Sequence, residues 1–270
     1  MPPIPRIRVV VDADACVPPA LLGALDIVCA PAVPSYFIEP EPIPFLITGG
    51  GPIDPAAIAE ACAAVAEPGE AVIYIRAEDG LASPDEAAGL ARAAVEARGA
   101  TFRYLATNGA LMGAGWAAVR AAECIARGGD LDAAFAAAEA TARRARVIAM
   151  LEHPEMAGIL PPGRDRAPGR MVVRIEGAKL PLLGALPLRE TALAALRDRF
   201  GDFAAEPEDS GRLRVAIHHA AAEAGATALA TWAERRFSGA EVVIAPLTRH
   251  AATRLGPGMI GIAWLWEPEE

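Results

Sequence analysis

The first half of the chain alternates short β-branched apolar runs with longer alanine-rich segments. The apolar runs, which are typical of buried strands, lie at residues 7–12, 26–33, 71–75 and 101–105. Helical composition with turn residues at the ends predicts helices at residues 55–66, from 84 onward, 111–127 and 130–146. Strands that alternate with helices in this way predict a largely parallel α/β sheet.

The second half contains runs of the same kinds in a less regular order. Strands are expected at residues 171–175, 179–183, 213–219, 241–245 and 259–266. Helices are expected from 189 to about 200 and at 221–237. The sequence therefore predicts two α/β domains: residues 1–147 with a largely parallel sheet, and residues 148–270 with a mixed sheet that would hold the ligand.

A Gly256-Pro257-Gly258 stretch stands directly before the last apolar run. Proline fixes its own φ and has no N–H, and glycine adopts positive φ, so this stretch predicts a tight turn. Thr253 and Arg254 are expected on that turn, which the following strand would anchor. Two interpretations remain open: Arg254 is a surface residue on a structural turn, or its guanidinium binds an anion with two hydrogen bonds.

Composition narrows the class of protein. The 270 residues are 53% hydrophobic, which favours a large core over disorder. The net charge of −9 disfavours broad nucleic-acid binding, and Lys179 is the only lysine. No apolar run is long enough to cross a bilayer, and the first residues lack the pattern of a signal peptide. A cytoplasmic protein with reduced thiols, no zinc site and no membrane insertion is expected.

Candidate chemistry is sparse along the chain. Asp12 ends the first strand and Asp14 follows it, and the two either cap a turn or serve a catalytic or metal site. Ser83 is expected to cap a helix, and it also offers a donor at a strand-to-helix turn. His218 and His219 are neighbours on a strand and point to opposite faces, which disfavours a shared metal. Without evident catalytic residues, a binding protein is favoured over an enzyme.

Several landmarks together resemble the DegV family, which includes the fatty-acid-binding subunit of bacterial fatty acid kinase. Residues 10–18 resemble its strand-then-Asp-Ser start, and residues 75–88 resemble its Ser-Gly-Thr turn. Residues 111–115 resemble its Ser-Met-Gly-x-Gly helix start, and residues 189–193 its Arg-x-x-Lys-Ala-Leu segment. Residues 253–263 resemble its closing His-x-Gly-Pro-Gly strand.

The resemblance implies two α/β domains and an apolar tunnel that holds a fatty acid or similar amphipathic carboxylate. Ala82 stands at the position of the family's anchor serine, and Arg254 at that of its histidine. A permanent cation at position 254 would still favour an anion. The residues that the resemblance places at the ligand are Thr48, Ser83, Arg189, Thr253, Arg254 and Gly256.

The chemistry in this interpretation belongs to a partner, a fatty acid kinase subunit, and the chain itself needs no catalytic residue, metal or cofactor. Two alternatives stay open. The chain is an enzyme or phosphotransfer protein on a related α/β scaffold that uses Asp12, Asp14 or a histidine, or it is a family member whose cavity is filled by its own side chains.

Overall fold

The computed structural model describes residues 6–30, 36, 54–77, 84–107, 109–159, 169–177, 179–205 and 211–268. The chain divides into two compact units, Met1–Pro34 with Pro52–Arg143, and Ser35–Gly51 with Arg144–Glu270. Tyr36 pairs with Thr248 in an isolated antiparallel bridge. A residue from the first part of the sequence therefore belongs to the unit formed mainly by the second part.

The first unit contains a parallel sheet. Its described strands are β1 (Ile7–Asp12), β2 (Ile27–Ala30), β3 (Ala71–Arg76) and β4 (Thr101–Ala106). They lie in the order β2-β1-β3-β4, and every pair is parallel. The chain moves from β1 to β2 on one side and then to β3 on the other. This change of direction makes the carboxyl ends of β1 and β3 the topological switch point of the sheet.

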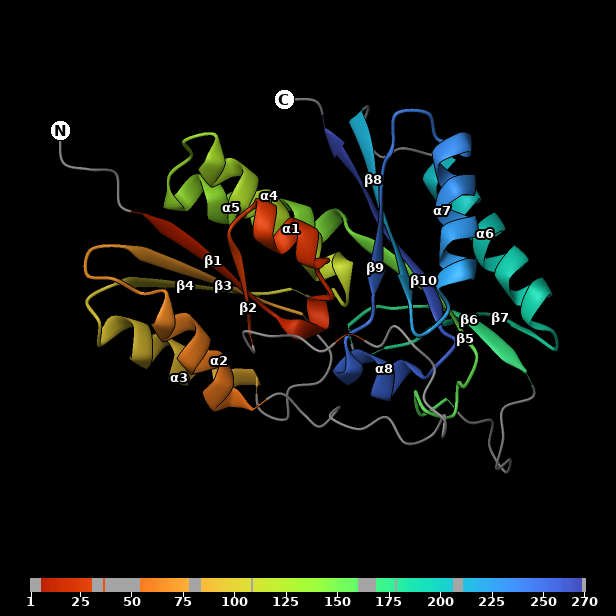
Figure 1. Ribbon diagram of the computed structural model, residues 1–270, viewed down its shortest axis with the longest axis horizontal. Helices are drawn as coiled ribbons and strands as arrows, with labels where there is room; N and C mark the ends of the chain where they lie inside the picture. Colours follow the sequence, from red (N-terminus) through yellow and green to blue (C-terminus); the bar gives the residue numbers. More distant parts are fainter. Residues whose placement is uncertain are drawn as a thin grey trace. The chain divides into compact units, whose positions relative to one another are not determined.

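Helices cover both faces of this sheet (Figure 1). The helical segments are η1 (Ala13–Ala15), α1 (Pro19–Ala24), α2 (Pro55–Ala64), α3 (Pro84–Glu96), α4 (Met112–Ala126) and α5 (Leu131–Arg144). On one face, α2 and α3 pack together over a core that includes Val10, Val72 and Tyr74. On the other face α4 lies against β1 and β3. A Cβ at Gly115 would lie 3.1 Å from the Ala15 carbonyl oxygen, so this glycine permits the close approach of α4.

The second unit contains a mixed sheet. Its described strands are β5 (Arg146–Leu151), β6 (Arg170–Arg174), β7 (Leu182–Leu186), β8 (Gly211–His219), β9 (Glu241–Pro246) and β10 (Ile260–Pro268). They lie in the order β7-β6-β5-β10-β8-β9, and β8 and β9 form the parallel pair. The predicted fold class, one parallel and one mixed α/β sheet, is confirmed.

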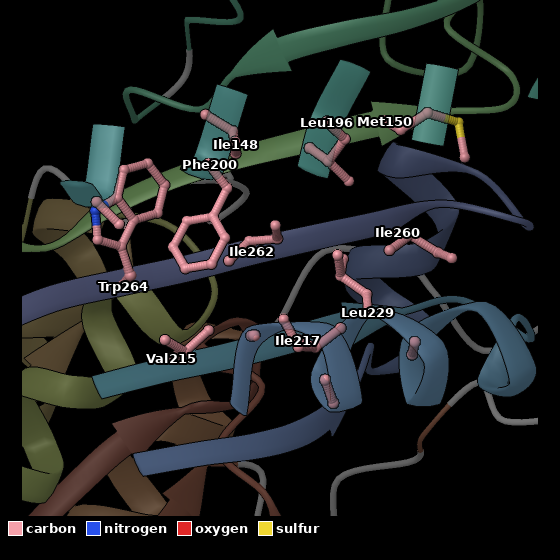
Figure 2. Close-up of a cluster of buried hydrophobic side chains, with 14 of the residues drawn as sticks. Ile148, Met150, Leu196, Phe200, Val215, Ile217, Leu229, Ile260, Ile262 and Trp264 are labelled. Atoms are coloured by element: carbon pink, nitrogen blue, oxygen red, sulfur yellow. The ribbon is translucent and has the colours of Figure 1, made fainter. Parts of the chain in front are cut away.

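Two helices, α6 (Arg189–Ala205) and α7 (Glu223–Arg236), cover one face of this mixed sheet (Figure 1). Figure 2 shows Leu196 and Phe200 of α6 and Leu229 of α7 gathered with the strand side chains that face them. Phe200 is fully buried, and its ring centroid lies 5.4 Å from that of Trp264 in an edge-to-face contact. This cluster is the core of the second unit.

Three expectations about local structure were wrong. The strand expected at 179–183 is β7 at Leu182–Leu186, because Lys179 and Glu176 pair backbone to backbone in the preceding hairpin. Helix α6 extends to Ala205, beyond the expected end near residue 200. Thr253 and Arg254 lie in a helix, α8 (Arg249–Leu255), and not on the turn itself.

Candidate functional site

Helix α8 and the turn that follows it form the first candidate site. The Thr248 side chain accepts a hydrogen bond from the Ala251 N–H and caps the start of the helix. At its other end Gly256 adopts φ 83° and ψ 155°, a conformation that favours glycine, and its N–H donates to the Ala252 carbonyl. The predicted turn therefore begins at Gly256, and Arg254 occupies the last turn of α8.

The turn is held on two sides within the second unit. The Gly258 N–H donates to the Ala220 carbonyl at 2.8 Å, and the Ala220 N–H donates to the Met259 carbonyl at 3.0 Å. A Cβ at Gly256 would lie 3.1 Å from the His153 Cβ, and one at Gly258 would lie 3.2 Å from the Glu152 Cβ. The turn is therefore packed between the end of β8 and the segment that follows β5.

The two side chains that precede the turn differ in what they offer a ligand. Thr253 donates its hydroxyl proton to the Arg249 carbonyl at 2.8 Å, so that proton is used inside the helix. Arg254 is half-buried and carries a permanent charge near the negative end of the helix dipole. The planar guanidinium of an arginine can donate two parallel hydrogen bonds to one carboxylate.

Arg189, at the start of α6, donates hydrogen bonds to a carboxylate and to a backbone carbonyl of the second unit. Its Nη1 donates to the Glu152 carboxylate at 2.5 Å and to the Gly258 carbonyl at 2.9 Å. The other Glu152 oxygen accepts from Arg170 Nε at 2.6 Å. Glu152 was not a candidate in the sequence. Its partners are 18 and 37 residues away, and no local pattern connects them.

Two further predicted ligand residues, Thr48 and Ser83, lie outside the described residues. The structure therefore brings Arg189, Thr253, Arg254 and Gly256 to one unit, around one turn. Helix α3 begins at Pro84, with Asp85 and Glu86 in its first turn, as the helix-start chemistry of the sequence predicted.

A second polar cluster lies at the switch point of the parallel sheet. Asp12 is 1% exposed, and its Oδ2 accepts from the Ala77 N–H at 2.8 Å. Thr107 donates to the Arg76 carbonyl at 2.6 Å. The Asp12 carboxylate makes no capping bond to η1, so the capping interpretation was wrong for this residue. It ties the end of β1 to the end of β3 instead.

Burial governs the ionisation of this cluster. Burial and, second, the neighbouring charge of Asp14 raise the pKa of Asp12 well above its usual value of 3.8. Burial also raises the pKa of Tyr74, which lies on the same face of the sheet. Among the described residues, neither Asp12 Oδ1 nor the Tyr74 hydroxyl has a hydrogen-bond partner. Asp12 is therefore a buried acid whose surroundings favour its neutral form, and its carboxyl group accepts a hydrogen bond from the Ala77 backbone amide.

The histidine pair ends strand β8. His218 is fully buried and its Nδ1 lies 2.9 Å from the Ala245 carbonyl, which makes that nitrogen the donor. His219 Nδ1 accepts from the Ala222 N–H at 3.3 Å. In the strand register His218 lies beside Gly261 and His219 beside Ile260, so the two rings face opposite sides of the sheet. Burial lowers the pKa of both imidazoles, most strongly that of His218.

Two other kinds of site are absent from the part of the chain that the structure describes. In these residues no three histidine, cysteine, aspartate or glutamate side chains are grouped as a metal ion would require. No described helix combines the length and the apolar composition needed to cross a membrane.

Comparison with known proteins places the fold. No family model matches the sequence, and a sequence comparison with curated proteins found no match. Among solved structures, the chain is similar to a DegV family protein from Corynebacterium glutamicum, with 20% identity, a TM-score of 0.76 and 98% of each chain covered. It is also similar to a DegV family protein from Thermus thermophilus described as fatty acid binding, with 19% identity, a TM-score of 0.74, and 97% and 100% of the two chains covered.

A third match is a stearic acid-binding protein from Eubacterium ventriosum, with 11% identity and a TM-score of 0.79. It covers 96% of this chain and 98% of that chain. These matches include both units, so the chain is a two-unit α/β protein of one known architecture. That architecture is the DegV fold.

Proposed function

We propose that the chain is a cytoplasmic member of the DegV family that binds a fatty acid or a similar amphipathic carboxylate. The observation that carries this proposal is the whole-chain likeness to solved structures described as fatty-acid-binding. In this proposal the chain holds the ligand and a partner performs any chemistry on it, as a fatty acid kinase subunit would. The absence of a sequence-level catalytic motif supports a binding role.

Apolar walls and one polar anchor are sufficient for such a ligand. Each buried CH₂ contributes about 0.8 kcal/mol, so a long acyl chain supplies most of the affinity without specific contacts. The carboxylate must keep hydrogen-bond donors when it leaves water. Arg254 is the donor we assign to it, because it lies in the last turn of α8, beside the Gly256–Gly258 turn, and its guanidinium suits a carboxylate.

Two measurements test the proposal. Lipid extracted from the purified protein, or native mass spectrometry of it, identifies a ligand acquired from the expression host. After removal of lipid, calorimetric titration compares palmitate with hexadecanol, which has the same chain length and no carboxylate. Wild-type protein is expected to bind palmitate more tightly than hexadecanol. If the delipidated protein binds neither probe, the proposal is wrong.

Substitution of Arg254 tests the anchor. Arg254→Met is expected to weaken palmitate binding by about 10- to 100-fold, the range for a charge-assisted hydrogen bond. Hexadecanol binding is expected to stay unchanged. Arg249→Met, in the same helix, is the matched control for loss of one positive charge. Equal losses for Arg249→Met and Arg254→Met would show that only the general field of the surface matters.

A further inference from the structure

One carboxylate, that of Glu152, connects the segments that surround the turn after α8. Glu152 follows β5, Arg170 begins β6 and Arg189 begins α6. Arg170 also donates to the Pro187 carbonyl at 2.9 Å, and Arg189 donates to the Gly258 carbonyl at 2.9 Å. Four separate segments of the second unit therefore meet through three side chains: the end of β5, the start of β6, the start of α6 and the turn after α8.

The burial and charge of this group indicate a fixed arrangement. The Glu152 side chain is 14% exposed and that of Arg189 is 29% exposed. Burial alone would raise the pKa of Glu152, but hydrogen bonds from Arg170 and Arg189 outweigh it and lower the pKa below its usual value. Glu152 is therefore an anion that accepts from a different arginine at each oxygen. Charge-assisted hydrogen bonds of this kind are the strong ones.

We propose that Arg189 is a positioning residue, which with Glu152 holds the Gly256–Met259 turn and so fixes the end of α8 that carries Arg254. This inference rests on the proposed function for its link to a ligand. It differs from the sequence expectation that Arg189 itself contacts the ligand. Arg189 donates to the backbone carbonyl of Gly258, which lies in the turn. This hydrogen bond fixes the position of the turn and does not involve a ligand.

The two roles for Arg189 predict opposite effects of one substitution. Glu152→Gln keeps the size of the side chain and removes its charge. If Arg189 were a direct anchor, this variant would leave its positive charge less compensated, and palmitate would bind more tightly. If Arg189 positions the turn, the variant loosens the turn, and palmitate binds about tenfold more weakly, as expected for one charged hydrogen bond. Hexadecanol binding would not change.

A matched control comes from the same sheet. Glu176 pairs with Arg174 at 3.0 Å, and both side chains are well exposed. Glu176→Gln makes the same change in charge outside the Glu152 group, and is expected to leave palmitate affinity unchanged. The double variant Arg254→Met with Glu152→Gln is expected to bind palmitate no more weakly than Arg254→Met alone, because both changes act through one anchor.

Amide hydrogen exchange in ligand-free protein separates this inference from the proposed function. Glu152→Gln is expected to raise exchange of peptides that cover residues 256–259 by about tenfold, whereas Glu176→Gln is not. Unchanged exchange in Glu152→Gln would overturn the positioning role, as would tighter palmitate binding. If wild-type protein binds no palmitate, the proposed function fails, while the exchange result still decides whether Glu152 and Arg189 hold the turn.

Discussion

The buried imidazole of His218 makes the stability of the second unit depend on pH. Burial lowers the pKa of His218 from 6.5 to about 3, its bond to the Ala245 carbonyl opposes the shift in part, and the neighbouring His219 adds to it. Below pH 6.5 the unfolded chain takes up a proton that the folded chain does not. The contribution of His218 to the free energy of unfolding is therefore fully present above pH 6.5, and it is lost progressively as the pH falls toward 3.

The size of the effect follows from the two pKa values. One pH unit of difference corresponds to about 1.4 kcal/mol, so full protonation would cost about 5 kcal/mol. At pH 5 only part of this cost has accumulated, about 2 kcal/mol. A loss of 2 kcal/mol is a large fraction of the stability of an ordinary domain.

Urea denaturation at pH 7 and pH 5 measures the effect. The variant His218→Asn keeps an amide nitrogen that can donate toward Ala245 and cannot titrate. Wild-type protein is expected to lose about 2 kcal/mol more than this variant between the two pH values, since all other titrating groups are shared. Trp232, Trp264 and Trp266 report on the second unit by fluorescence, and Trp116→Phe removes the signal of the first. Equal losses in both proteins would refute the reasoning.

Two other predictions concern the switch point and the turn. Because the pKa of Asp12 is raised above 3.8, the wild-type chain loses stability as the pH rises through the range between its unfolded and folded pKa values. Asp12→Asn, which keeps an acceptor for the Ala77 N–H, is expected to gain thermal stability relative to wild type over that range, and parallel pH profiles would contradict this. Gly256→Ala is expected to cost about 3 kcal/mol, because φ is 83° and the new Cβ meets His153. Gly239 has φ 85° and no atom within 4 Å of an added Cβ. Gly239→Ala is therefore expected to lower the free energy of unfolding, measured by denaturation, by only about 1–2 kcal/mol, the cost of the backbone conformation alone.

The elements that could be predicted from sequence are those with a strong local signal. The apolar run of residues 7–12 gave strand β1 at its observed bounds, and the run of 71–75 gave β3 to within one residue. Each is β-branched, buried and bounded by polar or turn residues. Helix α8 was missed because it has only seven residues, although Thr248 stands before it as a capping signal.

The site was harder to predict than the fold, since its contacts join residues that are distant in sequence. Arg189 could be selected by resemblance, but its bond to Glu152 spans 37 residues and has no sequence pattern. Asp12 was interpreted either as a cap of the turn after β1 or as part of a catalytic or metal site, and its carboxylate bonds an amide 65 residues away. Periodicity reports which side of an element is buried, and it does not report which buried polar groups meet.

Arg254 was expected on a turn but lies at the end of helix α8, and this position alters the physical argument for an anion site. A helix start attracts anions through its free N–H groups, whereas the end of α8 presents carbonyl oxygens and a partial negative charge. An anion placed there is repelled by the backbone, and a cationic side chain must compensate. Arg254 would then perform two functions, because its charge stabilises the end of α8 in the free protein and attracts the carboxylate in the complex. Its removal should lower stability slightly and affinity strongly, whereas a helix-dipole site would tolerate that loss.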